Sequence, residues 1–124
     1  MPIPRSRHVL AGFLLVLSLV GAPVASVAGE AFVSSVEDLP LMPGLLEDKP
    51  AGLTFDSAGG RIVEAYATGR VEEDEVLQFY GETLPQLGWT AEASALFHRG
   101  GETLRLDFQR GAKGLTVHYY LSPR

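Results

Sequence analysis

Two segments near the C-terminal end of the chain alternate apolar and polar side chains, and this alternation restricts the possible folds. In residues 102–109, Leu104, Leu106 and Phe108 fall on one side of an extended chain. In residues 115–121, apolar side chains again occupy every second position. A period of two with one apolar side is typical of antiparallel strands that cover a core with one face. The pattern therefore predicts two strands of a half-buried sheet.

Three further strands are predicted from turn signals and composition. Residues 95–99 precede Gly100-Gly101, which is a two-residue hairpin signal. Residues 53–56 and 61–68 contain β-forming side chains and flank the Ser-Ala-Gly-Gly turn at 57–60. These two segments therefore predict a second hairpin.

One helix is predicted over residues 72–87. Four acidic residues, 72–75, begin it, where the helix dipole favours negative charge. Gly88 marks its end, and Pro85 predicts a kink or a tightened last turn. The fold class is therefore α+β: a single antiparallel sheet in β-β-α-β-β-β order, with one helix packed across one face. One apolar stripe faces the sheet: Val76, Tyr80, Leu84 and Leu87.

Residues 1–28 have the three parts of a secretory signal peptide. Arg5 and Arg7 form a basic head, and residues 9–28 carry no charge. Small side chains at the two positions that a signal peptidase reads, Ser26 and Ala28, favour cleavage after Ala28, and we expect no stable membrane span thereafter.

Two alternatives at this end stay open. Cleavage after Ala25 is a weaker choice, and an uncleaved N-terminal anchor is the other, because an uncharged segment of this length could just span a bilayer. Gly21 and Pro23 make the second half of the segment a poor transmembrane helix. Cleavage is therefore the favoured interpretation.

The charge and cysteine content of residues 29–124 exclude several functions. This part holds 8 basic and 15 acidic residues, a net charge of −7, which argues against nucleic acid as a partner. The chain has no cysteine, so it has no disulfide, thiol nucleophile or thiolate metal site. The sequence predicts no cofactor.

Residues 29–52 are punctuated by prolines and glycines and show no clear periodicity. We predict a flexible lead over 29–36 and a proline-rich arm over 38–46 that packs its leucines on the domain. The α+β domain itself is predicted to occupy residues 53–124.

A sequence motif supports an envelope location. Residues 79–89 read FYxxxLPxLGW, and residues 97–104 read Phe-x-Arg-x-Gly-Glu-x-Leu. Together with Phe-Asp-Ser at 55–57 and Gly-Arg-Ile-Val-Glu-Ala at 60–65, they resemble an uncharacterised family of small exported envelope proteins of Gram-negative bacteria, over about residues 38–123. The resemblance implies a periplasmic location and an α+β domain. It carries over no activity and no functional residue.

The sequence predicts no catalytic and no metal site. His98 and His118 belong to strands that 102–109 separates in a sequential meander, and no metal-ligand spacing is present. No serine lies in Gly-x-Ser-x-Gly, and the acids at 72–75 do not have the alternate spacing of a calcium loop.

The polar face of the last two strands is the candidate partner-binding surface. Arginine and tyrosine are enriched at protein interfaces, although a solvated sheet face explains the same pattern. The candidate residues are Arg105, Gln109, Thr116, His118 and Tyr120.

We therefore expect a non-enzymatic binding or accessory module of the cell envelope, whose partner is another envelope protein. The alternative is a carrier of a small apolar ligand at the helix–sheet interface, and a minor hydrolase is the third hypothesis. A large gap beneath Tyr80, Leu84, Leu106 and Val117 would favour the carrier. A tightly packed interface there would favour the binding module.

Overall fold

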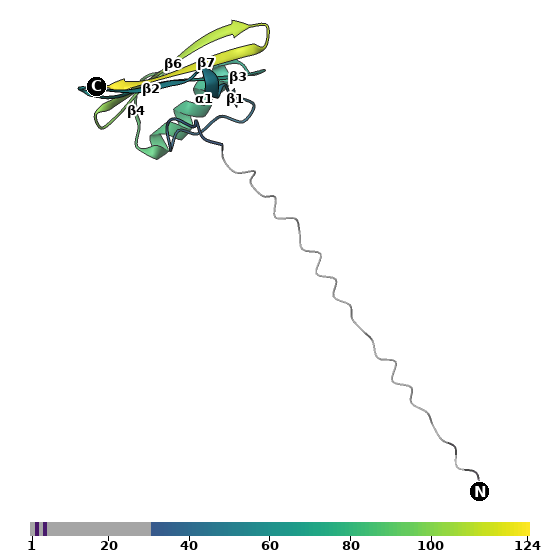
Figure 1. Cartoon of the computed structure of the whole chain (residues 1–124). Coiled ribbons are helices and arrows are strands. Elements are labelled where there is room, and N and C mark those ends of the chain that lie inside the picture. Colours follow the sequence, from purple (N-terminus) through teal and green to yellow (C-terminus); the bar gives the residue numbers. More distant parts are fainter. Residues whose placement is uncertain (1, 3, 5–30) are drawn as a thin grey trace.

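The computed structural model describes residues 2, 4 and 31–124 (Figure 1). The predicted signal peptide and its cleavage site lie outside the described residues. Within the described part, no helix is long and apolar enough to cross a membrane.

Residues 31–124 form one antiparallel sheet with a helix on one face, so the predicted α+β class is confirmed (Figure 1). The strand order is β1-β3-β7-β6-β5-β4, and β2 also pairs with β3. The last strand in the sequence therefore lies near the middle of the sheet. The strands are β1 (Leu46–Glu47), β2 (Leu53–Ser57), β3 (Gly60–Gly69), β4 (Thr90–Ala93), β5 (Leu96–Arg99), β6 (Glu102–Gly111) and β7 (Gly114–Pro123).

The five predicted strands are present, and β1 and β4 are additional. β1 has two residues and β4 has four, which is too short for an alternating pattern to show. Strand β6 lies between β5 and β7, as the predicted meander requires.

The helix α1 spans Glu73–Thr83 and continues as a 3₁₀ turn, Leu84–Leu87, which confirms the predicted tightened end at Pro85. At its start, the Glu72 amide donates to the Glu75 carboxylate at 3.3 Å. Gly88 adopts a left-handed φ of 92° and ends the turn. Of the predicted stripe, Val76, Tyr80 and Leu84 are buried, whereas Leu87 is 37% exposed.

The segment before the first strand packs beneath the sheet together with α1 (Figure 1). Leu39 and Leu45 of the predicted arm are buried, whereas Leu46 is 78% exposed. The prediction of a flexible lead is corrected for its described part: Val33 and Val36 are at most 2% exposed, and the Val33 amide donates to the Leu39 carbonyl at 2.9 Å. Burial of these valines stabilises the ordered segment. The core therefore extends to the N-terminal side of residue 53, and a short 3₁₀ turn, Lys49–Ala51, leads into β2.

Two glycines allow neighbouring backbone segments to approach each other closely. A Cβ on Gly114, whose φ is 111°, would lie 2.3 Å from the Gly69 carbonyl oxygen. A Cβ on Gly69 would lie 2.0 Å from the Gly44 carbonyl oxygen. The start of β7, the end of β3 and the arm can therefore meet only because these positions lack side chains.

Candidate functional site

No element of residues 31–124 covers the face of the sheet opposite α1, and the strand register places the predicted residues on this face. Tyr120 of β7 lies opposite Glu64 of β3 on one side and Arg105 of β6 on the other. His118 lies opposite Tyr66 and Asp107.

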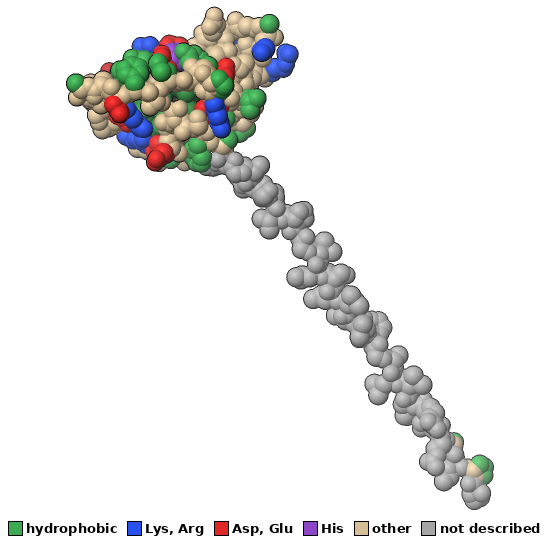
Figure 2. Space-filling view, viewed as in Figure 1, with side chains coloured by type: hydrophobic (Ala, Val, Ile, Leu, Met, Phe, Trp, Pro, Cys, Tyr) green, Lys and Arg blue, Asp and Glu red, His purple; other side chains and the backbone are tan. Residues whose placement is uncertain are grey.

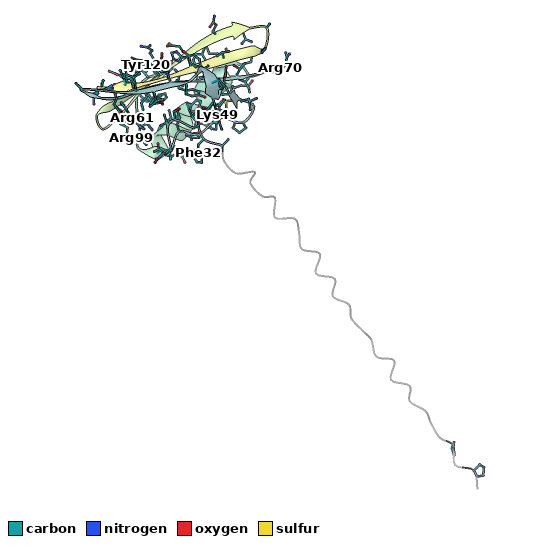
Figure 3. All side chains as sticks on the ribbon, in the orientation of Figure 1. Phe32, Lys49, Arg61, Arg70, Arg99 and Tyr120 are labelled. Atoms are coloured by element: carbon teal, nitrogen blue, oxygen red, sulfur yellow. The ribbon has the colours of Figure 1, made fainter. Side chains whose placement is uncertain are left out.

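Thr116 of the same strand lies opposite Thr68 and Gln109. All five predicted residues therefore share one face, which we call the open face. In Figure 3, Tyr120 lies on the side of the sheet away from Phe32, which precedes the arm.

His118 is the centre of a polar and aromatic network on the open face. Its ring stacks on Tyr66, with 4.5 Å between ring centroids and an interplanar angle of 3°. Its Nε2 atom lies 3.1 Å from Glu64 Oε1, within ion-pair distance but not aligned for a hydrogen bond. Its Nδ1 atom lies 3.9 Å from Asp107 Oδ2.

Arg105 extends this network toward Tyr120. The Arg105 Nε atom donates to Asp107 Oδ2 at 3.1 Å, and the guanidinium carbon lies 5.0 Å from the centroid of the Tyr120 ring. This stacking and pairing hold a long cationic side chain along the sheet surface. The network thus presents an arginine and two tyrosines in a defined arrangement, which is the composition of many protein-binding surfaces.

Glu64 and Tyr66 belong to the open face but were not predicted as site residues. They lie on β3, which pairs with β7 across about fifty residues of intervening sequence. The alternation within 61–68 places both residues on one side of their strand, and that was the signal available in the sequence. That pattern does not specify which strand pairs with β3.

Apolar side chains adjoin the network at the edge of the sheet. Leu53 and Phe55 of β2 are 51% and 47% exposed, and they lie opposite Glu64 and Ile62 of β3. Figure 2 shows hydrophobic side chains gathered beside a histidine on the upper surface of the molecule. A shallow hollow of about 390 Å³ lies at the other end of the open face, lined by Tyr66, Asp107, Phe108, Gln109, Thr116 and His118.

The helix–sheet interface is tightly packed. Tyr80, Leu84, Leu106 and Val117 are each at most 2% exposed. The buried Tyr80 hydroxyl donates to the Pro40 carbonyl at 2.8 Å and lies 2.6 Å from the Tyr119 hydroxyl. Burial raises the pKa of Tyr80 to about 12 and also raises the pKa of Tyr119. Both phenols therefore stay neutral across the physiological range.

An apolar groove of about 860 Å³ runs between the arm and the helix, away from the open face. Its apolar lining includes Leu41, Met42, Phe79 and Leu87, and Glu37 also borders it. This groove differs from the helix–sheet gap considered from the sequence, because the arm forms one wall.

Outside the open face, His98, Ser34 and Ser57 contact other polar groups. His98 Nδ1 lies 3.3 Å from Thr103 Oγ1, and its Nε2 atom lies beside the Glu92 carboxylate. The Ser34 hydroxyl donates to Glu47 and the Ser57 hydroxyl donates to the Gly60 carbonyl. Over residues 31–124, no three histidine or acidic side chains form a group that could hold a metal ion.

Comparisons with family models, with curated proteins and with solved structures return no match for this chain.

Proposed function

We propose that this protein is a non-enzymatic binding module of the cell envelope that contacts another envelope protein through the open face. The observation that carries the proposal is the juxtaposition of the Arg105–Tyr120 and His118–Tyr66 pairs with exposed Leu53 on an uncovered sheet face. Apolar side chains beside held arginine and tyrosine are typical of the centre of a binding surface.

The packed helix–sheet interface supports the same proposal. A carrier of the kind considered from the sequence needs an apolar volume beneath Tyr80 and Val117, and both side chains are fully buried. The open face, by contrast, needs no rearrangement to meet a partner.

The envelope location belongs to the proposal as well. We propose that residues 1–28 direct export and are removed, so that the periplasmic protein begins at Gly29. The support is the basic head, the uncharged segment and the small-residue exit, together with the family resemblance. Intact-mass measurement of the protein from a periplasmic extract tests this. A membrane fraction that holds a chain with residues 1–28 attached would replace this proposal with the anchor alternative.

The partner proposal is tested by affinity capture with the exported protein, tagged at its C-terminus. One variant combines Arg105→Glu with Tyr120→Ala, which reverses the charge and removes the aromatic ring of the open face. The matched control combines Lys49→Glu with Phe32→Ala, which makes the same kinds of change away from Tyr120 (Figure 3).

We expect the wild type and the matched control to retain the same envelope protein and the open-face variant to lose it. Titration calorimetry with the purified partner then checks that the contact is direct. Equal recovery of that protein by all three baits would place the contact outside the open face.

The groove between the arm and the helix favours a second candidate, a carrier of a small apolar ligand. Its volume of about 860 Å³ is in the range of small-molecule sites, and Leu41 and Phe79 supply apolar walls. Native mass spectrometry of the protein purified from the envelope tests it. An adduct that Leu41→Asp removes would support the carrier, whereas a bare protein mass would not.

A further inference from the structure

Within residues 31–124, the strand β2 is a free sheet edge with no side chain buried. Among these residues it pairs with β3 along one side only, and all five of its residues are exposed. An edge strand presents unpaired amide and carbonyl groups along its free side, and these groups can pair with another strand.

The opposite edge of the sheet is protected, whereas β2 is not. Strand β4 contains a register shift between Ala91 and Ala93 and carries Glu92, and both a bulge and a charge discourage pairing. Strand β2 pairs with β3 in continuous register from Leu53 to Ser57. Its only charged residue is Asp56, which already lies opposite Arg61 of β3.

The sequence of β2 is complementary to itself in one antiparallel register. When Phe55, the middle residue, faces Phe55 of a second copy, all five residues of each strand are paired. Thr54 then faces Asp56 of the other copy, so a hydroxyl donor meets the only carboxylate. A register centred on Asp56 would instead oppose two like charges, which is unfavourable.

In this register, even-numbered residues face even-numbered residues and odd-numbered residues face odd-numbered ones. The amide and carbonyl groups of alternate residues point away from β3, so those of the two copies point toward each other and can form hydrogen bonds. The Phe55 pair adds a cross-strand aromatic contact at the symmetry axis.

We propose that a second copy of this chain pairs with β2 to form a two-fold symmetric dimer with one continuous sheet. A two-fold axis perpendicular to the sheet keeps both open faces on the same side, so the dimer presents them side by side. The contact is a single five-residue ladder, which is smaller than a standard stable interface, and we therefore expect a weak, concentration-dependent dimer. This inference rests on β2 and does not depend on the proposed partner of the open face.

Symmetric crosslinking tests the register directly, because the chain has no cysteine. We expect Phe55→Cys in the exported protein to form a disulfide-linked dimer under mild oxidation, since residue 55 faces itself. Thr54→Cys is the matched control: it lies one residue away on the same strand, but it faces position 56 rather than itself. A Thr54→Cys variant that crosslinks as fast as Phe55→Cys would overturn the proposed register.

Sedimentation equilibrium of the cysteine-free protein tests the dimer without a crosslink. We expect the average mass to rise from monomer toward dimer with concentration, and Phe55→Lys to hold it at the monomer because two lysines then face each other. Phe32→Lys is the control, since Phe32 is 46% exposed and lies outside β2. Circular dichroism checks that both variants are folded. A wild type that stays monomeric up to millimolar concentration, or that grows into larger oligomers, would overturn the proposal.

Discussion

At the scale of single residues, the Tyr80 hydroxyl joins three parts of the core. It donates to the Pro40 carbonyl and contacts the Tyr119 hydroxyl, and the Met42 amide donates to it at 3.3 Å. The helix, the sheet and the arm therefore share one buried oxygen atom. An unpartnered polar group at such a site is costly because no water replaces the lost bond.

Tyr80→Phe and Tyr119→Phe are expected to differ in their effect on the free energy of unfolding. Tyr80→Phe leaves the Pro40 carbonyl, the Met42 amide and the Tyr119 hydroxyl without this partner, and we expect a loss of about 2–4 kcal/mol. Tyr119→Phe removes one bond and leaves the others, and we expect a loss of about 1 kcal/mol. Urea unfolding monitored by circular dichroism measures both, and equal losses would contradict the central role of Tyr80.

At the scale of elements, the arm is attached to the sheet by side chains as well as by burial. Both guanidinium ends of Arg99 donate to the Asp38 carboxylate, and Nη1 also donates to the Leu87 carbonyl at 3.1 Å. Hydrogen bonding from Arg99 lowers the pKa of Asp38. The guanidinium also covers the ring of the buried Trp89, 4.4 Å from its centroid. Arg99 thus connects β5 to the arm and to the end of the helix.

Arg99→Ala is therefore expected to cost more stability than Asp38→Ala. Asp38 is half exposed, so loss of its ion pair alone should cost less than about 1 kcal/mol. Arg99→Ala also uncovers Trp89 and removes the bond to the Leu87 carbonyl, and we expect a cost of about 1–2 kcal/mol. Thermal unfolding of the two variants compares them, and the reverse order would show that the carboxylate has contacts of its own.

The close approach of the start of β7 to the end of β3 gives a second prediction at the scale of elements. Gly114→Ala combines an unfavourable backbone conformation with a clash against the Gly69 carbonyl, and we expect a loss of about 2–4 kcal/mol. Gly111→Ala is the control on the same turn, because no atom lies within 4 Å of its Cβ position. We expect that variant to change stability by no more than about 0.5 kcal/mol. A comparable loss of stability in both variants would show that the cause is the turn and not the close approach of Gly114 to Gly69.

The elements also show which parts of the fold the sequence could predict. Strands and helix followed from periodicity and turn residues, because each burial pattern repeats within one element. The five open-face residues followed from the same alternation. Burial of Val33 and Val36 was not predicted, since their segment has no regular period and its contacts come from elements far along the chain. The pairing of β7 with β3 was likewise not predicted, because an apolar face does not specify which strand lies next to it.

At the scale of the whole molecule, stability is expected to fall steeply in alkaline solution. Burial raises the pKa of Tyr80 to about 12, whereas a tyrosine in an unfolded chain ionises near 10. Because the folded pKa is the higher one, this contribution is complete below about pH 10 and is lost as the pH rises toward 12. The raised pKa of Tyr119 acts in the same direction.

Parallel titrations of phenolate absorbance and circular dichroism measure this dependence. We expect ionisation of two of the four tyrosines to coincide with loss of the fold, and the coincident fraction to shrink in Tyr119→Phe. If all four tyrosines ionised while the circular dichroism stayed native, the buried pair would have to be accessible to solvent.

The position of β7 bears on when the fold can form. β7, which has ten residues, lies between β3 and β6 and pairs with both. Until β7 is present, β3 and β6 have no common neighbour, so the sheet is two separate pieces. Pairing over such sequence distances is slow to begin, because the chain must first close a long loop. A nascent chain therefore cannot complete its core until β7 has been synthesised.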